Sequence, residues 1–137
     1  MEVWGLYNAI KDAALSTAYV EQVTEGDVYD RWNNSLTMRY GAVNVSFTTQ
    51  TVSNHTVTHS VVLYYGDRLT EGGENKIDVW ERGVAVLRSV LNALQDVELE
   101  GDLVFNFFEQ KFADMLAGVW CEVRIESVDL QGECDAY

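Results

Sequence analysis

The chain has 137 residues, 47% of them hydrophobic, which is enough for one domain with a sound core and excludes an intrinsically disordered protein. It carries 22 acidic residues against 9 basic ones, a formal net charge of -13, whereas binding of nucleic acid through its phosphates needs a positive surface. Residues 1–20 lack a secretory signal and no segment could span a membrane, so we expect a soluble intracellular protein. The core is expected over residues 2–130, followed by an acidic tail.

The first predicted elements are a helix and a short strand. Apolar residues recur at helical spacing near the N-terminus and predict an amphipathic helix over residues 2–22. The stripe consists of Val3, Leu6, Tyr7, Ile10 and Ala14. Thr24–Asp27, with its glycine, is expected to end this helix, and Val28–Trp32 is expected to be a short strand.

A long β-hairpin is predicted next. Apolar residues alternate from Leu36 to Phe47, and their phase slips by one residue around Gly41, which suggests a β-bulge or a bend there. A polar turn at Ser53–His55, with Asn54 at its tip, leads into a second strand that ends at Tyr65. We expect this hairpin to contact a neighbouring subunit, because edge strands offer unpaired backbone groups.

The strongest helix prediction covers residues 76–96. Asn75 is expected to cap this helix, with Asp78 as a capping-box partner. Apolar residues step by three and four along the predicted core face, which consists of Ile77, Trp80, Val84, Leu87, Leu91 and Leu94. The opposite side carries Glu81, Arg82, Arg88 and Asn92 and is expected to be solvated.

Two closing strands are predicted over 103–109 and 118–130, joined through a compact turn at Lys111–Asp114. In the last strand Val119, Cys121, Val123 and Ile125 face one way, and Trp120 and its alternating neighbours face the other. The order of helix, strands, helix and strands predicts an α+β fold, a mainly antiparallel sheet with a long β-hairpin packed by two helices.

The two cysteines do not form a CxxC pair. Cys121 lies on the apolar side of its strand and is expected to be a small core residue, whereas Cys134 lies in the polar tail. Whether the two form a disulfide does not follow from the sequence.

No cofactor or metal site is predicted. His55 and His59 are four residues apart across a turn and a strand, a span of about 13 Å that is too long for a shared ion. We expect both to face solvent. Glu98, Glu100 and Asp102 alternate ahead of a strand, but they do not form a known calcium motif.

No catalytic site is predicted either. Asp67 follows an aromatic strand end, but no nucleophile lies near it in sequence. A carboxylate that caps local amides, or that contacts an arginine of a neighbour, is therefore favoured over a general base. Asp114 is expected to hold its turn by hydrogen bonding.

Aromatic residues are abundant in the last third of the chain. Phe105, Phe107 and Phe108 cannot all point to one side of a strand, so at least one of them is expected to face outward. Trp120 lies among charged residues, which indicates either an interface anchor or a side chain covered by the N-terminal helix.

Two segments carry a resemblance to a known family. They are Tyr64-Tyr-Gly-Asp-Arg-Leu-Thr70 before the Asn75 helix, and Phe108-Glu-Gln-Lys-Phe-Ala-Asp-Met-Leu-Ala-Gly-Val119 before the alternating strand. Together with the element order over residues 2–130, they resemble small neck and tail proteins of tailed bacteriophages, of the tail-terminator and tail-completion type.

The resemblance implies a virion protein that forms a homo-oligomeric ring, commonly of six subunits or a multiple, beside other neck or tail proteins. Expected subunit-interface residues are Asn54, Asp67, Arg68, Phe108 and Trp120. Genome DNA would pass without tight binding. Two acidic clusters are candidates to face the channel, and the sequence does not choose between them: the loop of Asp67, Glu71 and Glu74, and the strand edge of Glu98, Glu100 and Asp102. The alternatives are a non-catalytic adaptor and a small acidic enzyme that uses Asp67 or the Glu98–Asp102 cluster.

Overall fold

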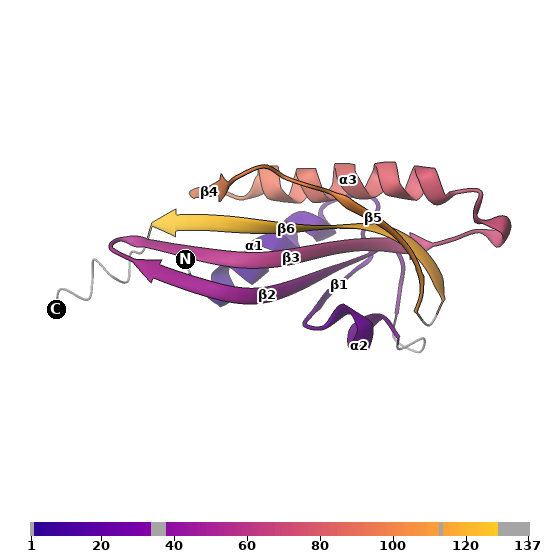
Figure 1. The fold of residues 1–137 in the computed structure, drawn as a ribbon, viewed down its shortest axis with the longest axis horizontal. Coiled ribbons are helices and arrows are strands. Elements are labelled where there is room, and N and C mark those ends of the chain that lie inside the picture. The colour runs from indigo at the N-terminus through magenta and orange to yellow at the C-terminus, as the bar shows by residue number, and fades with distance from the viewer. Residues whose placement is uncertain (1, 34–37, 113, 129–137) are drawn as a thin grey trace.

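The computed structural model describes residues 2–33, 38–112 and 114–128, which form an α+β fold with a six-stranded, mostly antiparallel mixed sheet and three helices (Figure 1). The strands lie in the order β1-β2-β3-β6-β4, and β5 also pairs with β6. The helices are α1 (Val3–Leu15), α2 (Val28–Trp32) and α3 (Lys76–Ala93), with a short 3-10 helix η1 (Glu71–Gly73). The strands are β1 (Gln22–Glu25), β2 (Ala42–Ser53), β3 (Thr56–Arg68), β4 (Val97–Glu100), β5 (Asn106–Lys111) and β6 (Met115–Val128).

The long hairpin is confirmed as the antiparallel pair of β2 and β3. Strand β3 pairs with β6 from Thr56 to Arg68, so the hairpin is built into the sheet and is not a free arm. Only its outer strand is exposed, from Thr48 to Ser53.

Of the two alternatives predicted at Gly41, the bend is present, at Tyr40–Gly41 just before β2, whereas the β-bulge lies between Phe47 and Thr49. Strand β2 begins only at Ala42, and of the predicted strand before it, Leu36 and Thr37 lie outside the described residues. The packing at Gly41 leaves no room for a side chain, because a Cβ there would lie 2.6 Å from the Tyr19 carbonyl oxygen.

The sheet has two unlike edges. At one edge β1 is parallel to β2 and pairs with it only from Ala42 to Val45. At the other edge β4, which was not predicted, and β5 both pair with the side of β6 that β3 leaves free. The predicted strand 103–109 begins at Asn106, after a connection that separates β4 from β5.

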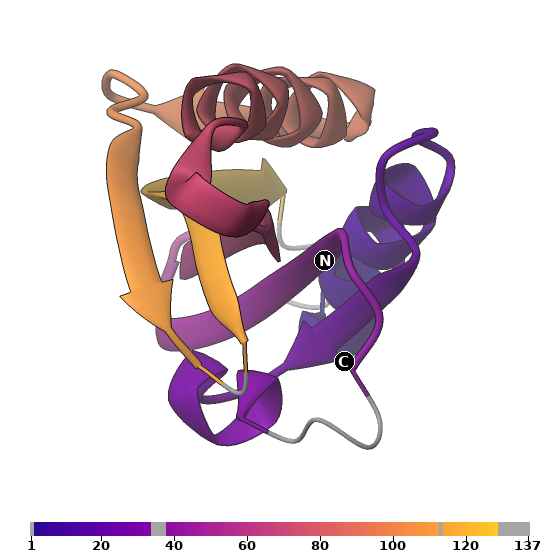
Figure 2. The same cartoon turned by 90° about the vertical axis from the view of Figure 1, so that its right-hand side faces the viewer.

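The main core lies between one face of the sheet and helices α1 and α3, whereas α2 packs near one end of the opposite face (Figure 2). Val119, Cys121, Val123 and Ile125 all point into this core, as predicted. Cys121 is a free thiol, and burial raises its pKa to about 12. Cys134 lies outside the described residues.

Helix α1 is shorter than predicted, because it ends at Leu15. Its buried stripe of Leu6, Ile10 and Ala14 is the expected one. The hydroxyl groups of Ser16 and Thr17 donate to the carbonyl oxygens of Ala13 and Ala14 and end the helix. Strand β1 begins at Gln22, the residue at which the predicted helix was expected to end.

Residues Val28–Trp32 form a helix, so the predicted strand was wrong. Val28 and Trp32 are four apart, a spacing that places two side chains on one side of either a strand or a helix. Asp27 decides the outcome, because its carboxylate accepts a hydrogen bond from the Tyr29 amide at 2.8 Å as an N-cap.

Helix α3 is confirmed, but its buried face is rotated from the predicted one. The buried residues are Val79, Gly83, Val86, Leu87, Val90 and Leu91. Ile77 is 69% exposed, and Trp80 and Val84 are half-buried at the flank. Arg82, expected in solvent, turns instead toward the end of β3.

Candidate functional site

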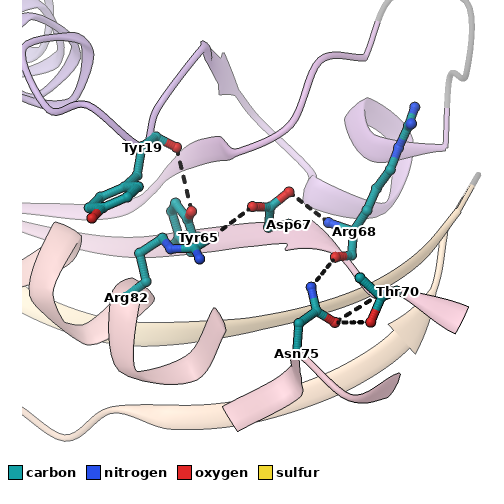
Figure 3. Close-up of polar contacts among 7 residues, drawn as sticks. All are labelled: Tyr19, Tyr65, Asp67, Arg68, Thr70, Asn75 and Arg82. Carbon is teal, nitrogen blue, oxygen red and sulfur yellow. Dashed lines mark hydrogen bonds and ion pairs between the residues drawn. The ribbon is translucent and has the colours of Figure 1, made fainter. Parts of the chain in front are cut away.

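The Asp67 site joins the end of β3 to α3 (Figure 3). The Oδ1 atom of Asp67 accepts from the Arg68 amide at 2.8 Å, and Oδ2 accepts from the Arg82 guanidinium at 3.0 Å. The side chains of Asp67 and Arg82 are 24% and 30% exposed, so this ion pair is partly shielded from water. The predicted local amide contact is confirmed, and the arginine contact is made within the chain.

Tyr65 lies beneath this pair and is fully buried. Its hydroxyl donates to the Tyr19 carbonyl oxygen at 3.4 Å, and the Arg82 guanidinium lies 5.0 Å from the centre of the Tyr19 ring. Burial raises the pKa of Tyr65 to about 12, and the Asp67 carboxylate contributes to the rise. Tyr65 therefore stays a neutral phenol at physiological pH.

Asn75 organises the loop between β3 and α3 rather than the helix. Its Oδ1 accepts from the amide and the hydroxyl of Thr70, at 2.8 and 3.1 Å, and its Nδ2 donates to the Arg68 carbonyl at 2.9 Å (Figure 3). It makes no side-chain capping bond to α3. The predicted capping box with Asp78 was therefore wrong.

Arg68 and Asp114 form an exposed pair between the β3 end and the β5–β6 turn. Arg68 Nε lies 3.6 Å from Asp114 Oδ2, and the Arg68 guanidinium lies 4.9 Å from the centre of the Tyr40 ring. Burial and the Asp114 carboxylate raise the pKa of Tyr40. The Asp114 carbonyl oxygen also accepts from the Phe112 amide at 2.9 Å, so Asp114 takes part in the turn as predicted. Ala113 lies outside the described residues.

These contacts fit a structural clamp better than catalysis. Both oxygens of Asp67 are occupied by donors, and no hydrogen bond in the described part of the chain brings a serine, cysteine or histidine to it. A general base needs an oxygen directed at the proton it removes. The Asp67–Arg82 pair instead fixes the end of β3 against α3.

The two histidines lie in different surroundings. His55 is exposed at the hairpin turn, with a positive φ of 68°. His59 is 1% exposed, so the expectation that it faces solvent was wrong. The amide nitrogen of Gln50 lies 3.1 Å from His59 Nε2 and can only donate, which places the ring hydrogen on Nδ1. Nδ1 is buried and has no partner among the described residues.

We predict that His59 makes the fold sensitive to mild acid. Burial lowers its pKa below the usual 6.5, so the unfolded chain binds a proton first as the pH falls. The stability that a neutral His59 contributes is complete above about pH 6.5 and decreases as the pH falls toward the lowered pKa. Between about pH 7 and pH 5, wild-type unfolding free energy should fall by up to about 1.4 kcal/mol per pH unit more than that of His59→Gln.

Urea unfolding at several pH values tests this prediction. The quantity to compare is the slope of the unfolding free energy against pH, because a substitution that lowers stability equally at every pH leaves this slope unchanged. His55→Gln is the matched control and should keep the wild-type slope. Equal slopes for wild type and His59→Gln would contradict the assignment.

The predicted acidic clusters lie apart. Glu71 and Glu74 are exposed at η1, near the other end of the long axis from β4 (Figure 1). Glu98 and Glu100 lie on β4, where a hydrogen bond to Glu100, burial and nearby Glu98 raise the pKa of Glu126. Asp102 takes no part in these contacts. Across residues 2–33, 38–112 and 114–128 no group of three or more His, Cys, Asp or Glu side chains could hold a metal ion.

Phe108 and Trp120 lie on the α2 face of the sheet and are half-buried. Trp120 stacks on Tyr64 with ring centres 6.1 Å apart, and no described contact joins it to α1. Phe108 packs against Tyr64 and Phe112. Phe107, one residue away, is the outward phenylalanine that the sequence predicted, and it is 56% exposed. Asn54 is exposed at the hairpin turn.

A groove of about 740 Å³ lies beside β2, where β1 ends. We name it the edge groove, and its apolar lining consists of Val3, Trp4, Tyr7, Val28, Tyr29, Phe47, Val62 and Tyr64. Trp4 is 72% exposed. The carboxyl-bearing residues Glu25 and Asp27 also line it. Sequence reasoning missed this groove because its lining comes from α1, α2 and the β2–β3 hairpin, which only the tertiary fold brings together.

A second apolar surface lies at the opposite edge of the sheet. We name it the helix patch, and it consists of Ile77, Trp80, Val84 and Phe107. The rings of Trp80 and Phe107 are 5.2 Å apart, and Trp80 Nε1 donates to the Phe108 carbonyl at 2.9 Å. The apolar spacing of α3 was the sequence signal for these residues, although it was assigned to the core.

None of the helices within the described ranges is long and apolar enough to cross a lipid bilayer. No model of a known protein family matches the chain, and no curated protein is significantly similar to it.

Proposed function

We propose that this chain is a non-catalytic structural subunit that assembles into a homo-oligomeric ring at the head–tail junction or tail end of a tailed bacteriophage. The observation that carries the proposal is the pair of unlike apolar surfaces at the two edges of the sheet. Exposed apolar surfaces mark interaction sites. Two different ones on one chain favour head-to-tail contacts, which close into rings.

The remaining support comes from the element order and the chemistry. The resemblance implies an order of helix, long hairpin, packed helix and closing strands, and the chain contains these elements in that order. It also implies rings of six subunits or a multiple that contact other neck and tail proteins. The Asp67 site is occupied by a clamp, as described above. The excess of acidic residues suits a ring through which DNA passes without being held, because phosphates are repelled from a negative wall.

The test has two measurements. Native mass spectrometry of the purified chain should give one closed oligomer, expected to contain six subunits or a multiple. Mass spectrometry of purified phage particles that encode the chain should detect it as a virion component. A protein that stays monomeric at all concentrations and is absent from particles would support the adaptor alternative instead.

A further inference from the structure

The edge groove has the features of a binding surface that lacks its occupant. Val3, Trp4 and Tyr29 are 44%, 72% and 49% exposed, although their side chains are apolar or aromatic. The groove lies where β1 ends, and beyond Val45 the outer edge of β2 is unpaired in the described part of the chain. Tryptophan and tyrosine at such a position are typical anchors of protein interfaces.

The helix patch is likewise apolar and exposed. Ile77 of α3 and Phe107 of β5 are 69% and 56% exposed, and together with Trp80 and Val84 they line a hollow of about 440 Å³. The patch is flanked by Lys76, whose ammonium group lies 5.4 Å from the centre of the Trp80 ring and 3.2 Å from the Glu109 carboxylate. Packing this patch against the edge groove of another copy would remove apolar area of both surfaces from water.

The charges of the two surfaces also complement each other. Glu25 and Asp27 line the edge groove, and neither forms an ion pair within residues 2–33, 38–112 and 114–128. Arg88 and Glu81 flank the helix patch, and Arg88 is exposed and equally without an ion pair in that part of the chain. In a chain of net charge -13, the unpaired Arg88 suits a carboxylate-lined groove, whereas Lys76 is already paired with Glu109.

We infer that the edge groove of one subunit receives the helix patch of a second copy of this chain, with Arg88 placed near Glu25 of its neighbour. The inference rests on the proposed self-assembly and names the surfaces that make it. Strand β2 beside the edge groove and strand β5, which carries Phe107, lie on opposite sides of the β3–β6 pair, so each subunit uses one surface toward each neighbour. Such a contact is head-to-tail and allows a ring.

Charge reversal is the first experiment. Glu25→Lys and Arg88→Glu should each weaken assembly, measured as the apparent Kd by sedimentation velocity, by about tenfold or more. The double variant Glu25→Lys/Arg88→Glu should recover to within about threefold of wild type, because the charge pair is restored in the opposite sense. Asp27 is left unchanged because it caps α2.

Mixing two blocked variants is the second experiment. Trp4→Glu removes the edge groove and Ile77→Glu removes the helix patch, and both side chains are exposed enough for the fold to remain intact. Each variant alone should be monomeric, whereas an equal mixture should form heterodimers and nothing larger, since each partner keeps one intact surface. Thermal unfolding of each variant checks the fold.

Val52→Glu is the matched control, because Val52 is 61% exposed on the outer strand of the hairpin, outside both surfaces. If rings still form in the Trp4, Ile77 and charge-reversal variants but not in Val52→Glu, the contact between subunits lies on the hairpin. That result would overturn this inference and leave the ring proposal intact. A wild-type chain that is monomeric at every concentration would overturn both.

Discussion

Replacing Gly118 by alanine is expected to destabilise the fold by about 3 kcal/mol or more, although alanine is ordinarily the better residue inside a strand. Gly118 lies in β6 between Gly66 of β3 and Phe108 of β5. A Cβ there would collide with the Tyr65 carbonyl oxygen, and it would lie 2.5 Å from Cζ of Phe108. The carbonyl belongs to the neighbouring strand and cannot move without breaking the β3–β6 pairing.

Two other glycines provide controls. Gly83→Ala places a Cβ 2.8 Å from Cγ2 of Val119, a side-chain atom, so its clash should be milder than that of Gly118→Ala. Gly5 is exposed in α1, and Gly5→Ala should stabilise the fold by up to about 1 kcal/mol through helix propensity. Urea unfolding should therefore give the highest free energy of unfolding for Gly5→Ala, an intermediate one for Gly83→Ala and the lowest for Gly118→Ala. A Gly118→Ala variant as stable as wild type would contradict the packing at this strand.

The sequence predicted the elements whose patterns are long. Helix α3, the β2–β3 hairpin and the alternation of β6 each repeat over many residues, so chance matches to the wrong period are few. Short elements failed: the five-residue α2 has an apolar spacing that fits a strand as well, and the alternation of β4 covers only the four residues Val97–Glu100, too few to distinguish a strand from a loop. Gly41 lies at a bend and not at the bulge, because it precedes β2 rather than interrupting it.

The rotated face of α3 shows a different limit. Apolar residues cover two adjacent stripes of this helix, one led by Ile77 and one by Val79. Periodicity alone cannot decide which stripe meets the sheet, because both have helical spacing. Gly83 favours the Val79 stripe, since the absence of a side chain there lets α3 approach Val119 and Tyr65 of the sheet closely.

The candidate sites were predictable only where their contacts are local. Asp67 bonds to the next residue, and this contact was expected from its place in the loop. Its pairing with Arg82 depends on how α3 lies over β3. The burial of His59 likewise depends on neighbouring strands, and the edge groove needs three separate elements to form.

Trp32 and Gly66 should be strongly coupled in a double-mutant cycle. Trp32 is fully buried, its Nε1 donates to Thr24 Oγ1 at 3.0 Å, and its ring packs against Phe112 and Tyr64. Cζ3 of this ring lies 2.6 Å from where a Cβ of residue 66 would be. Because contacts on several sides hold the ring in place, Gly66→Ala should lower the free energy of unfolding by about 2–3 kcal/mol.

Trp32→Leu should cost about 3 kcal/mol, because it leaves a cavity between α2 and the sheet. In that background the added methyl group of Gly66→Ala enters vacated space, so its cost should largely disappear, giving a coupling energy of about 1–2 kcal/mol or more. Leucine is chosen over alanine so that the double variant remains folded, since a domain of this kind has only about 5–15 kcal/mol of stability.

The matched control is Trp80→Leu, which removes a tryptophan whose contacts lie between α3 and β5 instead. Combined with Gly66→Ala, its effect should be additive within about 0.5 kcal/mol. Additivity in the Trp32 cycle as well would mean that α2 does not press its tryptophan onto β3. The packing of α2 beside the edge groove would then be wrong, together with the lining that Val28 and Tyr29 give that groove.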